Sequence, residues 1–181
     1  NVVYEYSLAK ALTDGLYVKN PTIAKRRDFN PAGRSIEEIE KIKLEDAVSI
    51  HEDTKQELKL YALNTGKRLV KPFILVVCRD TTHAKSVYDL VSSTDFYNGT
   101  FENKVLQIDS TTRNEELIEQ QFVSLENEDN EIEIVIHVNM LKEGWDVTNL
   151  YTIVPLRAAN ASILVEQTIG RGLRLPFSGE R

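Results

Sequence analysis

The chain has 181 residues, of which 41% are hydrophobic and 28% charged, and its formal net charge is −6 at pH 7. These values are typical of a globular domain with a sizeable core. The acidic balance argues against a protein that binds nucleic acid over its whole surface. The longest apolar runs are strand-sized, well short of the roughly 20 residues that span a bilayer. Cys78 is the only cysteine, so no internal disulfide can form, which fits a reducing compartment and predicts a cytoplasmic location.

The first seventy residues differ in pattern from the rest. Asn20-Pro21 and residues 30–33 (N-P-A-G) are breakers of regular structure. Ser35-Ile36-Glu37-Glu38 has the form of a capping box, and it opens a long, highly charged helical stretch towards Asn64. We expect residues 1–70 to form a lead-in whose long helix packs on one side of an α/β core. Residues 71–181 are expected to form that core, and the whole chain to be a fragment of a longer protein.

From about Lys71 onward, strand-sized apolar runs alternate with amphipathic stretches of helical length. Strands are expected at Phe73–Cys78, Lys104–Asp109, Ile132–Val138 and Leu150–Val154. This alternation predicts βαβ units, and therefore a mostly parallel sheet with helices on both faces and right-handed crossovers.

Turn and capping signals mark the segments between these strands. Thr81 or Thr82 can cap a helix that carries apolar residues up to Val91, and Thr112–Glu115 fits a capping box before a second helix. A final helix is expected after Asn160. The acidic run from Glu126 to Glu131 is expected to be a solvated loop.

Three loops follow predicted strands, at residues 78–82, 109–112 and 139–146. In open parallel sheets, ligands lie beyond the carboxyl ends of the strands. The Ser and Thr residues of the first two loops also precede helices, so capping is their ordinary role, although the same helix N-termini can bind phosphate. In the third loop, Asp146 can accept a hydrogen bond from a ribose hydroxyl or an arginine. Trp145 is more simply a core residue than a platform for a nucleic-acid base.

The most informative motif is the run Gln167–Arg174, which reads Q-T-I-G-R-G-L-R. Arg171 and Arg174 are three residues apart, so on a helical turn they project to one face, and arginine presents a planar fork of donors that suits phosphate oxygens. An arginine supplied from outside the phosphate-binding loop can raise the rate of ATP hydrolysis by about 10³–10⁵. The alternative interpretation is a basic final turn of a surface helix, which neutralises the helix dipole.

Other parts of a nucleotide-hydrolysing site are missing from the sequence. It contains no G-x-x-x-x-G-K-[ST] run, and no predicted strand ends in the paired acids that hold Mg²⁺. The three histidines, His51, His83 and His137, lack metal-ligand spacing, so no metal site is expected. The chain therefore offers arginines for phosphate chemistry without a phosphate-binding loop of its own.

These motifs resemble the second RecA-like lobe of superfamily 2 helicases. Gln167–Arg174 is similar to motif VI, Met140–Val147 to motif V and Phe73–Arg79 to motif IV. The sequence E-G-W-D-V followed by Q-T-I-G-R-G-L-R-L-P most resembles the ATP-dependent Res subunit of type III restriction enzymes. Type I restriction motor subunits and some repair helicases share this lobe. The resemblance is strongest over residues 135–176 and weaker over residues 71–110.

The resemblance implies a three-layer RecA-like fold and a role as the second motor lobe of an ATP-dependent DNA translocase or helicase. ATP with Mg²⁺ would bind between two lobes, held mainly by a first lobe of the same polypeptide. This chain alone would be inactive. The implied partners are that first lobe, double-stranded DNA and a modification methyltransferase subunit, with no membrane. The alternative is a non-catalytic helicase-like docking or regulatory module.

By position, the resemblance also implies roles for individual residues. Arg174 would be the arginine finger on the γ-phosphate, Arg171 would assist it, and Gln167 would face the γ-phosphate or the attacking water. The residues implied to line the nucleotide cleft are Gly144, Asp146 and Gly170. The residues implied to contact the DNA backbone are Arg79, Ser110, Thr111 and Asn139, the last in place of a threonine that many members of the superfamily carry.

Overall fold

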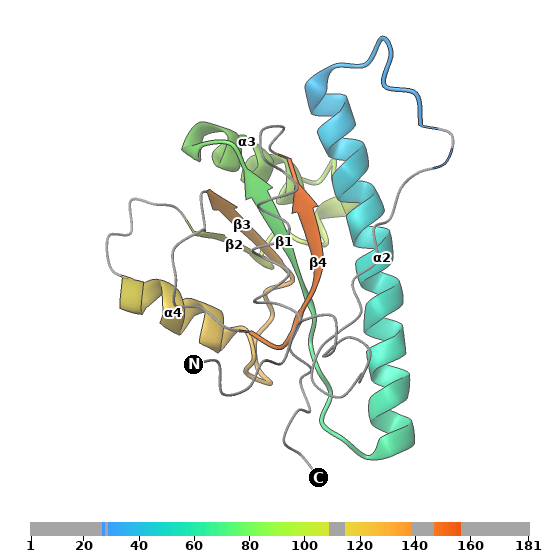
Figure 1. Cartoon of the computed structure of the whole chain (residues 1–181), viewed down its shortest axis with the longest axis vertical. Coiled ribbons are helices and arrows are strands. Elements are labelled where there is room, and N and C mark those ends of the chain that lie inside the picture. Colours follow the sequence, from blue (N-terminus) through green and yellow to red (C-terminus); the bar gives the residue numbers. More distant parts are fainter. Residues whose placement is uncertain (1–26, 28, 109–114, 139–146, 157–181) are drawn as a thin grey trace, which may run out of the picture.

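The computed structural model describes residue 27 and residues 29–108, 115–138 and 147–156. Within these ranges the chain forms three α-helices, a 3₁₀ turn and four strands (Figure 1). In chain order they are α2 (Ile36–Thr65), β1 (Phe73–Cys78), α3 (Thr81–Val91), η1 (Tyr97–Gly99), β2 (Val105–Ile108), α4 (Glu115–Ser124), β3 (Ile134–Val138) and β4 (Leu150–Pro155).

The four strands form one sheet in the order β2-β3-β1-β4, and every neighbouring pair is parallel. β1 and β3 occupy the two central positions, and all of their residues are buried. Both read as unbroken apolar or near-apolar runs because a parallel sheet that is covered on both faces needs apolar side chains on both. The mostly parallel sheet predicted from the sequence is confirmed.

Helices cover both faces of this sheet (Figure 1). On one face, α2 and α3 share a hydrophobic cluster with the sheet that includes Leu44, Val87 and Ile136. On the other face, Phe122 of α4 packs in a second cluster with Phe73 and other residues of β1, β2 and β3. The connection from β1 to β2 carries α3 and moves in one direction along the sheet, whereas the connection from β2 to β3 carries α4 and moves back. Two crossovers of the same hand must then place their helices on opposite faces, which gives the three-layer α/β architecture of the RecA-like type.

Both ends of α2 are capped, the first by the capping box that the sequence predicts and the second by a glycine that was not predicted. Ser35 Oγ accepts a hydrogen bond from the Glu38 N–H at 3.2 Å, and Glu38 Oε2 accepts from the Ser35 N–H at 2.8 Å. At the other end, Gly66 adopts φ +69° and its N–H donates to Ala62 O at 2.9 Å, a left-handed cap that glycine adopts at little cost. The long helix is thus closed at both ends by local interactions.

The burial of α2 is uneven along its length. Leu44, Ala47, Val48 and His51 recur at helical spacing and are buried against the sheet. In contrast, the last turns expose large apolar side chains, with Leu60 59% and Leu63 73% exposed. α2 is therefore held on the sheet by its first half.

The expected strands and helices of the described ranges are confirmed, with small shifts in their ends. β2 begins at Val105 and β3 at Ile134, later than expected. β3 starts late because Ile132 N–H donates to Asn130 Oδ1 in a local turn, so this residue does not enter the ladder. The helix expected after Asn160 and the capping residues 112–114 lie outside the described residues.

The helices that the structure describes include none that is both long enough and apolar enough to cross a bilayer. The longest of them, α2, has 30 residues but a strongly charged sequence.

Candidate functional site

The three strands that precede the loops singled out by the sequence all end at one edge of the sheet. β2, β3 and β1 lie side by side and run parallel, with Cys78 paired to Val138 and Ile108 paired to His137. The carboxyl ends of these strands are consequently within one register step of one another. In parallel sheets this edge is where ligands bind.

Arg79 follows β1 directly and is the one predicted site residue within the described ranges. The other predicted site residues, Ser110, Thr111, Asn139, Gly144, Asp146, Gln167, Gly170, Arg171 and Arg174, lie outside those ranges. The chain leaves the described sheet towards Ser110 after Ile108 and towards Asn139 after Val138.

The Arg79 side chain is 44% exposed, and its Nη1 lies 3.7 Å from Glu40 Oε1. At this separation the two groups form an ion pair, but they are farther apart than the atoms of a good hydrogen bond. Because the contact is long and water and salt reach the guanidinium, the pair contributes only about 0–1 kcal/mol. The guanidinium therefore keeps most of its capacity to bind an external anion.

Behind Arg79 lies a buried pair that connects α2 to α3. His83 Nδ1 accepts a hydrogen bond from the Arg79 N–H at 3.2 Å, and His83 Nε2 lies 3.0 Å from Glu40 Oε2. Because Nδ1 is an acceptor here, Nε2 carries the ring proton and donates it to Glu40. Glu40 thus contacts both the guanidinium of Arg79 and the imidazole that fixes the Arg79 backbone.

The N-cap of α3 is Asp80, whereas the sequence analysis placed Thr81 or Thr82 there. Asp80 Oδ1 accepts from the His83 N–H at 2.8 Å. Asp ranks above Thr as an N-cap, and its charge also complements the helix dipole. A carboxylate at this position already fills the place that a phosphate would take at the helix N-terminus. The remaining group at this turn with the chemistry to bind an anion is the Arg79 guanidinium.

Cys78 ends β1 beneath this turn and is fully buried. Burial, with a smaller contribution from the nearby Glu40 charge, raises the pKa of the Cys78 thiol to about 12. The thiolate is the reactive form of cysteine. Cys78 is therefore a core residue without nucleophilic character at neutral pH.

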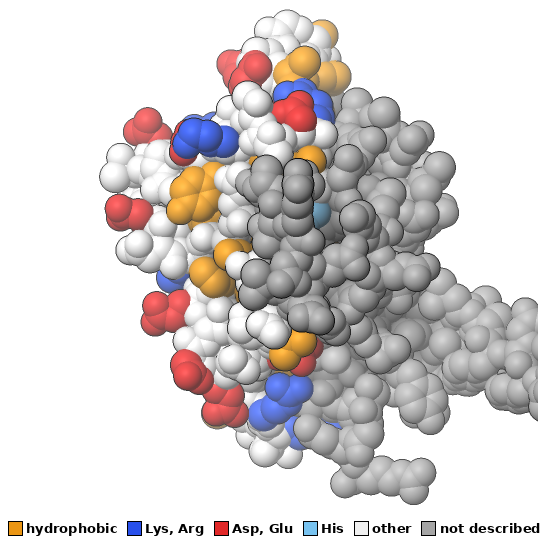
Figure 2. Space-filling model, turned by 90° about the vertical axis from the view of Figure 1, so that its left-hand side faces the viewer, with side chains coloured by type: hydrophobic (Ala, Val, Ile, Leu, Met, Phe, Trp, Pro, Cys, Tyr) orange, Lys and Arg blue, Asp and Glu red, His pale blue; other side chains and the backbone are white. Residues whose placement is uncertain are grey.

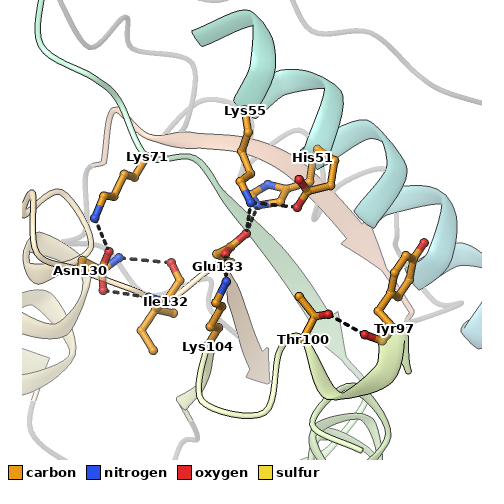
Figure 3. A network of polar contacts seen from close by, with 10 residues as sticks. His51, Lys55, Lys71, Tyr97, Thr100, Lys104, Asn130, Ile132 and Glu133 are labelled. Atoms are coloured by element: carbon orange, nitrogen blue, oxygen red, sulfur yellow. Dashed lines mark hydrogen bonds and ion pairs between the residues drawn. The ribbon is translucent and has the colours of Figure 1, made fainter. Parts of the chain in front are cut away.

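A second polar cluster lies at the opposite, amino-terminal edge of the sheet, centred on Glu133 just before β3 (Figure 3). Lys104 Nζ donates to Glu133 Oε1 at 2.6 Å, and Lys55 Nζ donates to Oε2 at 2.8 Å. His51, fully buried on α2, has its Nε2 3.0 Å from the same Oε2. Burial alone would raise the pKa of Glu133, but the hydrogen bonds from His51, Lys104 and Lys55 outweigh burial and hold this pKa well below its usual range.

His51, Glu52 and Glu133 are close enough to suggest a cation site. However, Lys55 Nζ bridges Glu52 Oε1 at 2.9 Å and Glu133 Oε2 at 2.8 Å, and Lys104 Nζ covers the remaining Glu133 oxygen. Two ammonium groups already neutralise the two carboxylates, and they would repel a metal ion. We interpret this cluster as an ion-pair network that fastens α2 to the starts of β2 and β3.

The acidic run also has a structural role that the sequence analysis missed. Glu126 Oε1 accepts hydrogen bonds from both the N–H and the hydroxyl of Thr148, just before β4. Nearby, Asn149 Nδ2 donates to Lys71 O at 3.0 Å and to Leu125 O at 2.8 Å. These bonds join the segments before β1 and β4 to the end of α4. The start of the acidic run is therefore part of the scaffold.

Neither a scan against protein-family models nor a search of curated proteins finds a match to this chain.

Proposed function

We propose that the chain is the second motor lobe of an ATP-dependent DNA translocase or helicase, of the kind found in the Res subunit of type III restriction enzymes. In this proposal ATP with Mg²⁺ binds between this lobe and a first RecA-like lobe of the same polypeptide, in the cytoplasm. Double-stranded DNA and a modification methyltransferase subunit are the other partners. Closing of the lobes on ATP and their reopening after hydrolysis would move DNA that both lobes grip.

The observation that best supports the proposal is the parallel order β2-β3-β1. It places Arg79, from the motif IV-like strand, at the same sheet edge as the strand end that precedes the motif V-like loop. In open parallel sheets, ligands bind beyond the carboxyl ends of the strands, so this edge is where the lobe would meet nucleotide, DNA and a partner lobe. The absence of a phosphate-binding loop from the sequence agrees with a lobe that completes a site held by another domain.

The charge of the surface agrees with a lobe that binds DNA together with another domain and not alone. On the face shown in Figure 2, acidic side chains are spread along the described surface, with basic side chains among them. The described part of this face thus carries no continuous basic track. With a net charge of −6, the chain alone should bind DNA weakly, and binding would depend on a few local contacts such as Arg79.

The test is the DNA-stimulated ATPase rate of the full-length protein, wild type against Arg174→Ala. We expect a loss of about 10³–10⁵-fold with nucleotide binding largely kept, because an arginine finger acts on the transition state. Arg34→Ala removes the same charge from an exposed turn before α2 and should leave the rate unchanged. An unchanged rate for Arg174→Ala would contradict the proposal and favour a non-catalytic docking module.

A further inference from the structure

The contacts around Arg79 form a closed ring. The Arg79 N–H donates to His83 Nδ1, His83 Nε2–H donates to Glu40 Oε2, and Glu40 Oε1 faces the Arg79 guanidinium. His83 and Glu40 are buried, at 6% and 8% exposure, whereas the guanidinium reaches solvent. The ring therefore has a rigid interior side and one exposed, positively charged member.

The two contacts of Glu40 differ in strength. The 3.0 Å contact with His83 is a short hydrogen bond in a buried setting, where electrostatic interactions are strong. The 3.7 Å contact with Arg79 is longer and partly solvated, hence weak. An external anion can replace Glu40 at the guanidinium without breaking the bond between Glu40 and His83.

We propose that Glu40 competes with a DNA backbone phosphate for the guanidinium of Arg79, and that His83 holds Glu40 in the competing position. This inference rests on the proposed function, since it requires Arg79 to contact DNA. Glu40 then weakens DNA binding at this point by pairing with the Arg79 guanidinium that the phosphate would otherwise bind. Such a residue favours release of DNA, which a translocating motor must repeat in every cycle.

The variant that tests the inference is Glu40→Gln in the full-length protein. Glutamine keeps an oxygen that can accept from His83 Nε2–H but carries no charge, so the buried hydrogen bond survives. Affinity for a mixed-sequence DNA duplex should rise about two- to tenfold, the range for loss of one partly exposed charge interaction. Asp53→Asn makes the same charge change at an exposed site further along α2 and should alter affinity much less.

A double-mutant cycle with Arg79→Gln separates competition from a general effect of charge. Arg79→Gln should weaken binding, and in that background Glu40→Gln should no longer strengthen it. If Arg79→Gln weakens binding but Glu40→Gln in the native background does not strengthen it, the inference fails and the DNA contact of Arg79 stands. If Arg79→Gln binds DNA like the wild type, Arg79 is no DNA contact, and the inference fails together with that part of the proposed function.

A measurement on the wild-type protein avoids any doubt about whether the variants fold. The ¹⁵N NMR resonances of the His83 ring report the hydrogen bond to Glu40, and they should shift when duplex DNA withdraws the guanidinium from the same carboxylate. Resonances that stay unchanged at saturating DNA would overturn the competition.

Discussion

The Glu133 carboxylate contacts His51 and Lys55 of α2 and Lys104 just before β2. Its charge is the centre of the network at the amino-terminal edge of the sheet (Figure 3). Replacement by glutamine would leave Lys55 and Lys104 facing each other without a carboxylate between them. Because both ammonium groups are about one-third exposed, screening reduces the penalty below that of a fully buried pair. We expect Glu133→Gln to lower the free energy of unfolding by about 1–3 kcal/mol at neutral pH in urea titrations.

The same variant has a characteristic pH dependence. The pKa of Glu133 is lowered in the folded state from an ordinary value of 4.5. The Glu133 charge therefore contributes fully to the free energy of unfolding above pH 4.5, and this contribution declines as the pH falls below that value. The difference between wild type and Glu133→Gln should therefore shrink on acidification below about pH 4.5. Glu131→Gln, at an exposed position two residues earlier, should show a small difference throughout. A Glu133→Gln difference that grows in acid would contradict the network.

Residue-scale contacts of this kind could not be predicted from the sequence. Glu40 precedes His83 by 43 residues and His51 precedes Glu133 by 82, and nothing in local spacing pairs them. The side chains meet because α2 lies across the sheet, which brings one end of the helix to the carboxyl edge and the middle to the amino edge. In contrast, the burial of Cys78 follows from its place in the apolar run of β1, whereas the cap of α3 was predicted at Thr81 or Thr82 and is Asp80.

At the scale of elements, the capping box in the first turn of α2 contributes to the stability of this helix. The Ser35 hydroxyl and the Glu38 carboxylate satisfy each other's N–H groups, and without the hydroxyl one N–H loses its partner. We expect Ser35→Ala to cost about 1 kcal/mol in urea unfolding. The control is Ser49→Ala, at an exposed mid-helix position, which should be neutral or slightly stabilising because alanine is the better helix former. Equal effects of the two substitutions would show that the capping box does not stabilise α2.

Element boundaries were predictable where the signal is local. The capping box at Ser35 and the apolar run of β1 each fix an element through neighbours in the chain. The left-handed stretch at Tyr97, Asn98 and Gly99 was not foreseen. Glycine adopts this conformation at little cost and asparagine tolerates it, so Tyr97 is the residue that needs other support. Tyr97 receives it from the tertiary structure, since its hydroxyl donates to Glu45 O of α2 at 3.1 Å and its ring packs against Phe96 and Phe101.

At the scale of the whole molecule, the proposal predicts that the chain cannot act alone. The isolated chain should hydrolyse ATP no faster than a variant with Arg171→Ala and Arg174→Ala, with or without DNA, because it lacks a phosphate-binding loop. A coupled assay of phosphate release measures this directly. DNA-stimulated turnover above that double variant would mean that the chain holds a complete site, and the division into two lobes would be wrong.

The sequence by itself determined the α/β class, the strands and helices of the described ranges, and the parallel arrangement that ends β1, β2 and β3 at one edge of the sheet. Those features depend on hydrophobic periodicity and capping, which are local in the chain. Only the tertiary structure decided the strand order β2-β3-β1-β4, the packing of α2 on β1 and β4, and the joining of Glu40 to Arg79 and His83. Strand order and long-range ion pairs arise from the packing of whole elements around a common core. The spacing of residues in the sequence does not predict which elements become neighbours.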